Sequence, residues 1–157
     1  ALLVAGCPDA AITPADDASV IDDVEDEAGI SLGTHVQWKQ QPSDFVTLED
    51  GSELPIVLGH QGAWMVVLAL RSEAFLEGPV DLSVGIEAAG TNLGELQLVE
   101  QDLDRELDGH DYIYDIWLIV ADPSLSTYQA RVSASVTDAG GRTFSIERQV
   151  VLSGGLD

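Results

Sequence analysis

The stretch that decides the fold is YQARVSASVT at residues 128–137. In this stretch, apolar residues alternate with polar ones. Such a period of two is typical of a strand with one buried face, whereas a surface helix gathers its apolar residues on a single stripe. The sequence therefore predicts a strand, with Val132 facing the core and Arg131 facing solvent. Apolar side chains fall at every second position of the stretch: Tyr128, Ala130, Val132, Ala134 and Val136.

Similar patterns surround this stretch. The DAGG sequence at residues 138–141 predicts a tight turn, because glycine readily adopts positive φ angles, and alternation resumes from Phe144 to Leu152. We expect an all-β fold, an immunoglobulin-like β-sandwich of about seven to nine antiparallel strands, with a small barrel or jelly roll as the alternative. Other strands are expected at residues 35–40, 45–48, 54–58, 64–70, 79–87, 95–100 and 112–120.

Composition limits the classes of partner. The 157 residues carry a formal net charge of −22, with six Lys and Arg residues against 28 Asp and Glu residues. Such a chain repels nucleic acid and anionic lipid headgroups, so we expect no nucleic-acid partner. Its single cysteine rules out an intrachain disulfide and a cysteine zinc cluster.

The N-terminal residues predict a lipid anchor. Residues 1–7 read ALLVAGC, and an apolar run with small residues before a cysteine is typical of a lipoprotein signal peptide and its lipobox. We expect residues 1–7 to be the end of that signal peptide, with Cys7 lipidated. Residues 8–30 are expected to be a disordered acidic linker and residues 31–157 the β-domain.

A longer motif carries a family resemblance. Residues 45–62 follow the pattern F-x-x-L-x-D-G-x-x-L-x-I-V-x-G-x-Q-G. This segment resembles one in secreted proteins and lipoproteins of myxobacteria and related deltaproteobacteria. The resemblance implies an exported β-domain and no activity. From the residues themselves, we expect a hairpin turn at Asp50 and Gly51 and a second turn at His60 and Gln61, with a ligand-binding loop at His60 and Gln61 as the alternative.

An acidic run is the candidate metal site. Its oxygen-bearing residues have a spacing close to that of an EF-hand calcium loop, although Glu106 stands where a shorter side chain is usual and Asp115 replaces a glutamate. The alternative is an exposed loop kept soluble by its charge. The candidate calcium ligands are Asp102, Asp104, Glu106, Asp108 and Asp115.

These observations predict a non-enzymatic protein of the cell envelope. The sequence has no G-x-S-x-G and no phosphate-binding glycine motif, so no catalytic residue is expected. We expect a lipid-anchored binding or structural module, facing the periplasm or on the outer membrane, whose partners are the membrane and other envelope proteins. The alternatives are a calcium-binding adhesion or sensor domain and, third, an envelope hydrolase.

Overall fold

The computed structural model describes residues 29–36, 40–73, 75–121 and 127–154. Within these ranges the chain forms ten strands and one short 3₁₀ helix, so the all-β prediction is confirmed. No helix among the described residues is long and apolar enough to cross a membrane. The elements are β1 (Ile30–Thr34), η1 (Pro42–Asp44), β2 (Val46–Thr47), β3 (Ser52–Leu58), β4 (Trp64–Ser72), β5 (Val80–Ala88), β6 (Thr91–Gln101), β7 (Asp104–Arg105), β8 (Asp111–Ile119), β9 (Tyr128–Thr137) and β10 (Thr143–Gly154).

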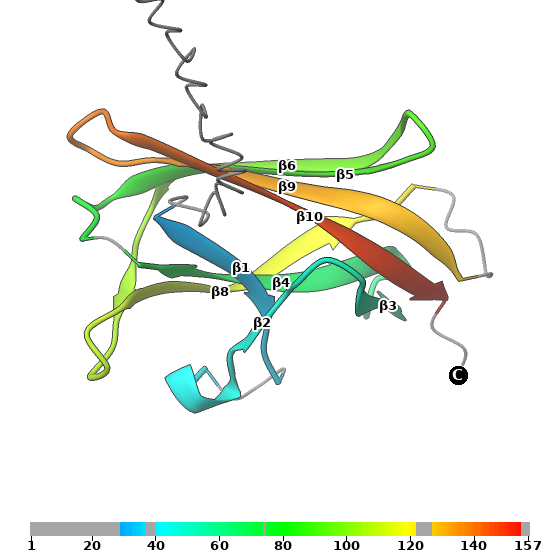
Figure 1. The fold of residues 1–157 in the computed structure, drawn as a ribbon, viewed down its shortest axis with the longest axis horizontal. Helices are drawn as coiled ribbons and strands as arrows, with labels where there is room; N and C mark the ends of the chain where they lie inside the picture. The colour runs from blue at the N-terminus through cyan, green and yellow to red at the C-terminus, as the bar shows by residue number, and fades with distance from the viewer. Residues whose placement is uncertain (1–28, 37–39, 74, 122–126, 155–157) are drawn as a thin grey trace, which may run out of the picture.

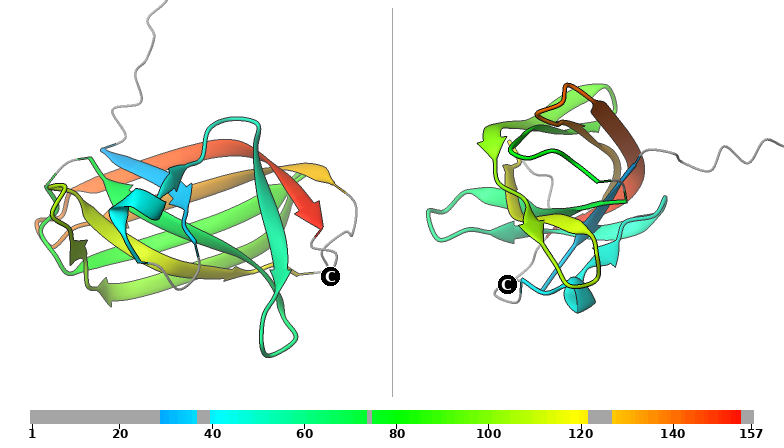
Figure 2. Two further views of the ribbon diagram at one scale, coloured as in Figure 1. Left: turned by 90° about the horizontal axis from the view of Figure 1, so that it is seen from below. Right: turned by 90° about the vertical axis from the view of Figure 1, so that its left-hand side faces the viewer.

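The strands form one curled sheet with two halves that lie on either side of the core (Figure 1). The first half, here called the β4 half, contains β1, β2, β4, β7 and β8. The second, the β9 half, contains β10, β9, β5 and β6. An end-on view shows the strands curled around a common centre (Figure 2, right).

Strand β3 joins the two halves. Its first residues pair in parallel with β10, with Leu54 opposite Leu152, and its last two pair antiparallel with the start of β4. The expectation of antiparallel strands alone is therefore wrong. Asp50 and Gly51 do form a turn, but not a hairpin, because β2 pairs with β1 while β3 pairs with β10 and β4. The immunoglobulin-like sandwich remains a prediction.

The core lies between the two halves, and period-two alternation fills it. Val132 is fully buried and Arg131 is only half-buried, so the predicted register of β9 is confirmed. Trp117 points outward from β8, while its neighbours Ile116 and Leu118 are buried. Large side chains with almost no exposure form the centre: Leu32, Leu54, Ile56, Leu68, Leu70, Leu82, Ile86, Ile116, Leu118 and Leu152.

The first strand begins earlier than predicted. β1 starts at Ile30, which is buried opposite Ser72 of β4, one residue before the expected boundary of the β-domain. The strand expected at residues 35–40 is wrong, because His35 and Val36 lie beyond the end of β1. Residues 37–39, like the predicted linker up to residue 28 and Cys7, lie outside the described residues.

The end of β8 meets the start of β6. The backbone N–H of Ala121 donates to the carbonyl oxygen of Leu93 at 2.7 Å. At Gly94 a side chain would collide with the carbonyl oxygen of Ile119, so glycine permits this close approach. The curl of the sheet is thereby closed at this end by main-chain contact.

Two substitutions in β9 test the register. Val132→Asp places an unpaired carboxylate in the core and should destabilise the fold by about 4 kcal/mol or more. Arg131→Gln removes only surface ion pairs with Glu87 and Glu147, at 3.0 and 3.8 Å, and should cost about 1 kcal/mol or less. Urea unfolding measures both values. Equal losses would contradict this assignment of inner and outer faces.

Candidate functional site

The end of the domain where the described chain begins gathers several loops. It comprises Gly29, the β4–β5 loop (residue 73 and residues 75–79), the β7–β8 turn (residues 106–110) and the β9–β10 turn (residues 138–142), and is called the Gly29 end below. The Glu73 N–H donates to the carbonyl oxygen of Gly29 at 2.8 Å, which fixes the start of the chain beside the β4–β5 loop. In Figure 1 this end lies to the left, and the C-terminus lies to the right.

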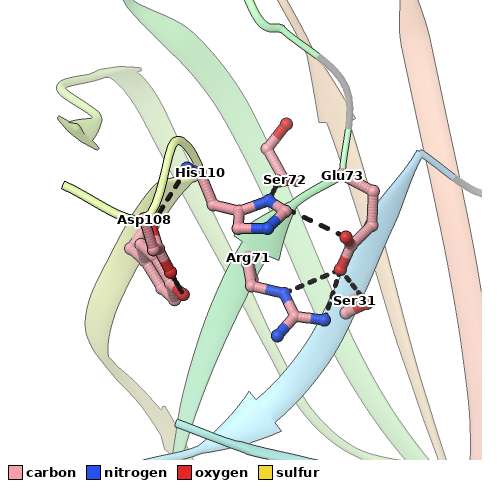
Figure 3. A network of polar contacts seen from close by, with 7 residues as sticks. Ser31, Arg71, Ser72, Glu73, Asp108 and His110 are labelled. Carbon is pink, nitrogen blue, oxygen red and sulfur yellow. Dashed lines mark hydrogen bonds and ion pairs between the residues drawn. The ribbon is translucent and has the colours of Figure 1, made fainter. Parts of the chain in front are cut away.

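Glu73 is the centre of a polar network at this end (Figure 3). Its Oε1 accepts hydrogen bonds from Ser31 Oγ and Arg71 Nε, both at 2.7 Å. Burial raises the pKa of Glu73, but these two hydrogen bonds and the charge of Arg71 outweigh it and hold the pKa below its ordinary value. The network thus ties β1 to the end of β4 through an ionised carboxylate.

His110 and Asp108 attach the β7–β8 turn to the same network. His110 Nδ1 donates to the carbonyl oxygen of Ser72 at 2.9 Å and lies 3.8 Å from Glu73 Oε2. Asp108 Oδ2 accepts a 2.5 Å hydrogen bond from the Tyr112 hydroxyl. That bond lowers the pKa of Asp108, while burial and the same bond raise the pKa of Tyr112 to about 12. The pair therefore keeps its proton on Tyr112 at neutral pH.

A row of aromatic rings lies behind the network on the outer face of the β4 half. The Tyr112 and Tyr114 rings stack with centroids 5.2 Å apart, and the Phe45 ring meets Tyr112 edge-on at 5.6 Å. Burial is the main cause that raises the pKa of Tyr114. Both tyrosines are buried, so this row forms a small second core beneath the segment that carries Phe45.

Arginine contacts hold the β4–β5 loop from two sides. Arg142 Nη2 donates to the carbonyl oxygen of Phe75 at 2.6 Å and pairs with the buried Asp138 at 2.7 Å. Burial raises the pKa of Asp138, but hydrogen bonds from Arg142 and from the Glu77 N–H outweigh this effect and hold the pKa below its ordinary value. From the other side, the Arg105 guanidinium lies 4.6 Å from the centre of the Phe75 ring. The loop is therefore fixed to both β7 and the β9–β10 turn.

Two large apolar side chains remain in solvent at this end. Phe75 is 65% exposed, although the backbone around it is held by hydrogen bonds. Leu107 is fully exposed in the β7–β8 turn, between Glu106 and Asp108. The turn is closed by a hydrogen bond from the Gly109 N–H to the Glu106 carbonyl oxygen at 3.1 Å. Both apolar tips are thus presented by well-bonded loops.

The structure places the predicted calcium ligands at separate positions and does not gather them around one point. Asp104 lies in β7, paired with β8, and Glu106 Oε1 lies 3.5 Å from the Tyr114 hydroxyl. Asp102 lies exposed between β6 and β7. Across the described ranges, no group of three or more His, Cys, Asp or Glu side chains is placed to hold a metal ion.

Asp115, the fifth predicted ligand, lies at a bulge in β8. Leu68 pairs with Ile116 and Leu70 with Ile113, so Tyr114 and Asp115 together face Ala69. Asp115 has a φ of +54° and accepts hydrogen bonds from Gln40 Nε2 at 2.7 Å and His35 Nε2 at 3.0 Å. The bulge turns this carboxylate toward the segment that follows β1, where both of its oxygens accept hydrogen bonds.

The remaining predicted residues lie elsewhere. His60 and Gln61 are exposed in the β3–β4 turn, which is closed by a hydrogen bond from the Gly62 N–H to the Gly59 carbonyl oxygen at 2.9 Å. The predicted second turn is therefore present, and the alternative ligand role of its two residues stays a prediction. Cys7 lies outside the described residues.

A shallow trough of about 470 Å³ crosses the outer face of the β9 half. Its middle is lined by small residues that face one another across the strands, with Ser83 opposite Ser135 and Gly85 opposite Ser133. Arg131 lies at one side and bridges Glu87 and Glu147. The trough therefore offers hydroxyl and charged groups, and Ile86 and Ile146 add apolar atoms to its lining.

Sequence reasoning missed Phe75, Arg105 and Leu107. A signal for Leu107 was present, since a large apolar residue inside the acidic run DRELDGHD at residues 104–111 is unexpected in a solvated turn. Arg105 and Phe75 are thirty positions apart in the chain, and only the fold brings them together. No protein-family model and no curated protein sequence matches the chain.

Glu73→Gln tests the network through pH. Because the pKa of Glu73 is lower in the folded chain, its stabilising effect is present above the ordinary value of 4.5 and lost as the pH falls through the folded value. At about pH 6 the substitution should lower the free energy of unfolding by up to about 1 kcal/mol, since the carboxylate is partly exposed and screened. Urea melts should show the two proteins converging as the pH falls below the folded pKa of Glu73.

The matched control is Glu53→Gln, which removes the same charge from an exposed position in β3. A constant difference between wild type and Glu73→Gln over the whole pH range would contradict the role of the Glu73 carboxylate.

Calcium titration tests the acidic run. Because Asp108 and Asp115 already accept hydrogen bonds, we expect calcium at about 10 mM to shift the melting temperature no more than magnesium does. Differential scanning calorimetry in each chloride salt makes the comparison. A calcium-specific rise of several degrees that Asp104→Asn abolishes would support the calcium alternative.

Proposed function

We propose that this chain is a lipid-anchored β-domain of the bacterial cell envelope and acts without catalysis, as a binding or structural module. The observation that carries the proposal is the sequence AGC at residues 5–7, which follows an apolar run and contains the only cysteine. The resemblance of residues 45–62 to exported proteins of myxobacteria and related deltaproteobacteria supports the same location.

The protonation states at the Gly29 end support a non-catalytic role. Tyr112 keeps its proton and Asp108 stays ionised at neutral pH, because their mutual hydrogen bond lowers the pKa of Asp108, while burial and that bond raise the pKa of Tyr112. Glu73 and Asp138 are ionised and bound to arginines. A general acid or base needs a pKa near the working pH, and these groups serve instead as fixed hydrogen-bonded and ionic contacts.

The polar groups of the trough on the β9 half support a partner that carries polar groups of its own. Small hydroxyl side chains at its middle leave polar backbone and side-chain atoms accessible, and Glu87, Glu95 and Glu147 at its sides add negative charge. A second envelope protein that binds there would offer polar or basic groups in return. This surface lies on the opposite half of the sheet from the Glu73 network.

Cys7→Ser tests the anchor, because lipidation requires the thiol. The wild-type protein should stay in the membrane fraction through a high-salt wash, since two or more acyl chains bind stably. The substituted protein should move to the soluble fraction, with an unchanged melting temperature as proof of folding. Persistence of the substituted protein in washed membranes would show that the anchor is not the Cys7 lipid.

A further inference from the structure

We propose that Phe75 and Leu107 contact the bilayer and lay the Gly29 end against the interface of a zwitterionic membrane. This inference rests on the proposed lipid anchor, which confines the domain near a bilayer. It goes further by assigning a contact surface and an orientation to the domain itself.

The place where the chain enters the fold favours this end. The segment that follows Cys7 reaches the described structure at Gly29, whose carbonyl oxygen is bonded to the Glu73 N–H. Ser72 in turn is bonded to His110 of the β7–β8 turn, at whose tip Leu107 lies. Phe75 lies two residues beyond Glu73. A lipid at Cys7 is therefore connected through the chain to the end of the domain that carries both apolar tips.

Both tips are held in place rather than left loose. Arg105 connects them, because its guanidinium covers the Phe75 ring while its side chain pairs with Asp111 at 2.8 Å at the base of the β7–β8 turn. Arg142 and Asp138 fix the backbone of the Phe75 loop from the other side. Single exposed apolar residues are common, but two on adjacent, well-bonded loop tips form a surface suited to an apolar medium.

The charge of this end selects the lipid. Three carboxylates, Glu73, Asp111 and Asp138, are neutralised by Arg71, Arg105 and Arg142. Asp102, Asp104, Glu106 and Asp108 nevertheless lie near the tips, and the chain as a whole has a net charge of −22. Anionic headgroups would repel this end, whereas phosphatidylcholine and phosphatidylethanolamine would not. Apolar side chains at the depth of the headgroups are the usual means of such contact.

The opposite end offers a matched control. Leu58 is 59% exposed at the end of β3 and pairs with Trp64, the first residue of β4. Because Ser72 at the other end of β4 lies at the Gly29 end, Leu58 lies a full strand length away. It has the same side chain as Leu107 and is also exposed, although less fully, but it should not reach the lipid.

The experiment places a fluorophore at each position in the full lipidated chain. Once Cys7 carries lipid, Leu107→Cys or Leu58→Cys provides the one free thiol for an environment-sensitive nitrobenzoxadiazole label. The labelled proteins are reconstituted on vesicles of phosphatidylcholine and phosphatidylethanolamine, with or without acyl chains brominated near the glycerol. Protein that floats with the vesicles shows that the anchor holds, and the fluorescence emission of the label shows whether that position contacts lipid.

We expect the label at residue 107 to shift its emission to the blue and to lose intensity with brominated lipid, and the label at residue 58 to do neither. Adding phosphatidylglycerol should reduce both effects at low salt. Anchored protein without quenching at residue 107, or with equal quenching at both positions, overturns the inference and leaves the proposed anchor intact. A blue shift without lipid quenching shows that a second copy covers the tip, which also overturns it. Failure to float refutes the anchor itself.

Discussion

The structure depends on one strand that belongs to both halves of the sheet. β3 pairs in parallel with the last strand of the chain and then antiparallel with the start of β4. Leu54 and Ile56, which face inward from it, are almost completely buried. Pro55 lies between them, opposite Ser153 of β10, and β3 changes partner after Ile56. Without β3, the two halves would still share a core, but their main chains would meet only at local contacts such as the hydrogen bond from Ala121 to Leu93.

The pairing of β3 with both β10 and β4 determines where the candidate surfaces lie. With β4 fixed beside β3 at its start, the other end of β4 places Arg71, Ser72 and Glu73 next to β1 and the β7–β8 turn. The outer face of the β9 half is left free for the polar trough. The described chain therefore begins at one end of the domain (Figures 1 and 2). Phe75 and Leu107 are exposed at this end, and the trough lies on the opposite half of the sheet.

The elements that could be predicted are those in which a single strand carries its own signal. The alternation around Val132 identifies β9 and its buried face without reference to any neighbour. The first strand was missed because Ile30 and Leu32 directly follow an acidic stretch, while alternation at residues 35–40 suggested a strand there. The parallel pairing of β3 was not predictable, since its partner is about a hundred residues away.

The candidate site shows the same limit more strongly. The acidic run has the oxygen spacing of a calcium loop, but spacing says nothing of Tyr112, His35 and Gln40, which bind Asp108 and Asp115. Likewise, the surroundings of Phe75 come from β7 and from the β9–β10 turn. Side chains that gain their role from distant partners need the tertiary structure, whereas a strand face does not.

Native-state hydrogen exchange tests the joining role of β3 most directly. If β3 unites the halves, the best-protected amides of β3, β4 and β9 should open with one free energy, equal to that of global unfolding. The same value should be obtained from urea unfolding of the whole domain. The account is contradicted if β3 and β4 exchange through a smaller opening while β9, β5 and β10 remain protected.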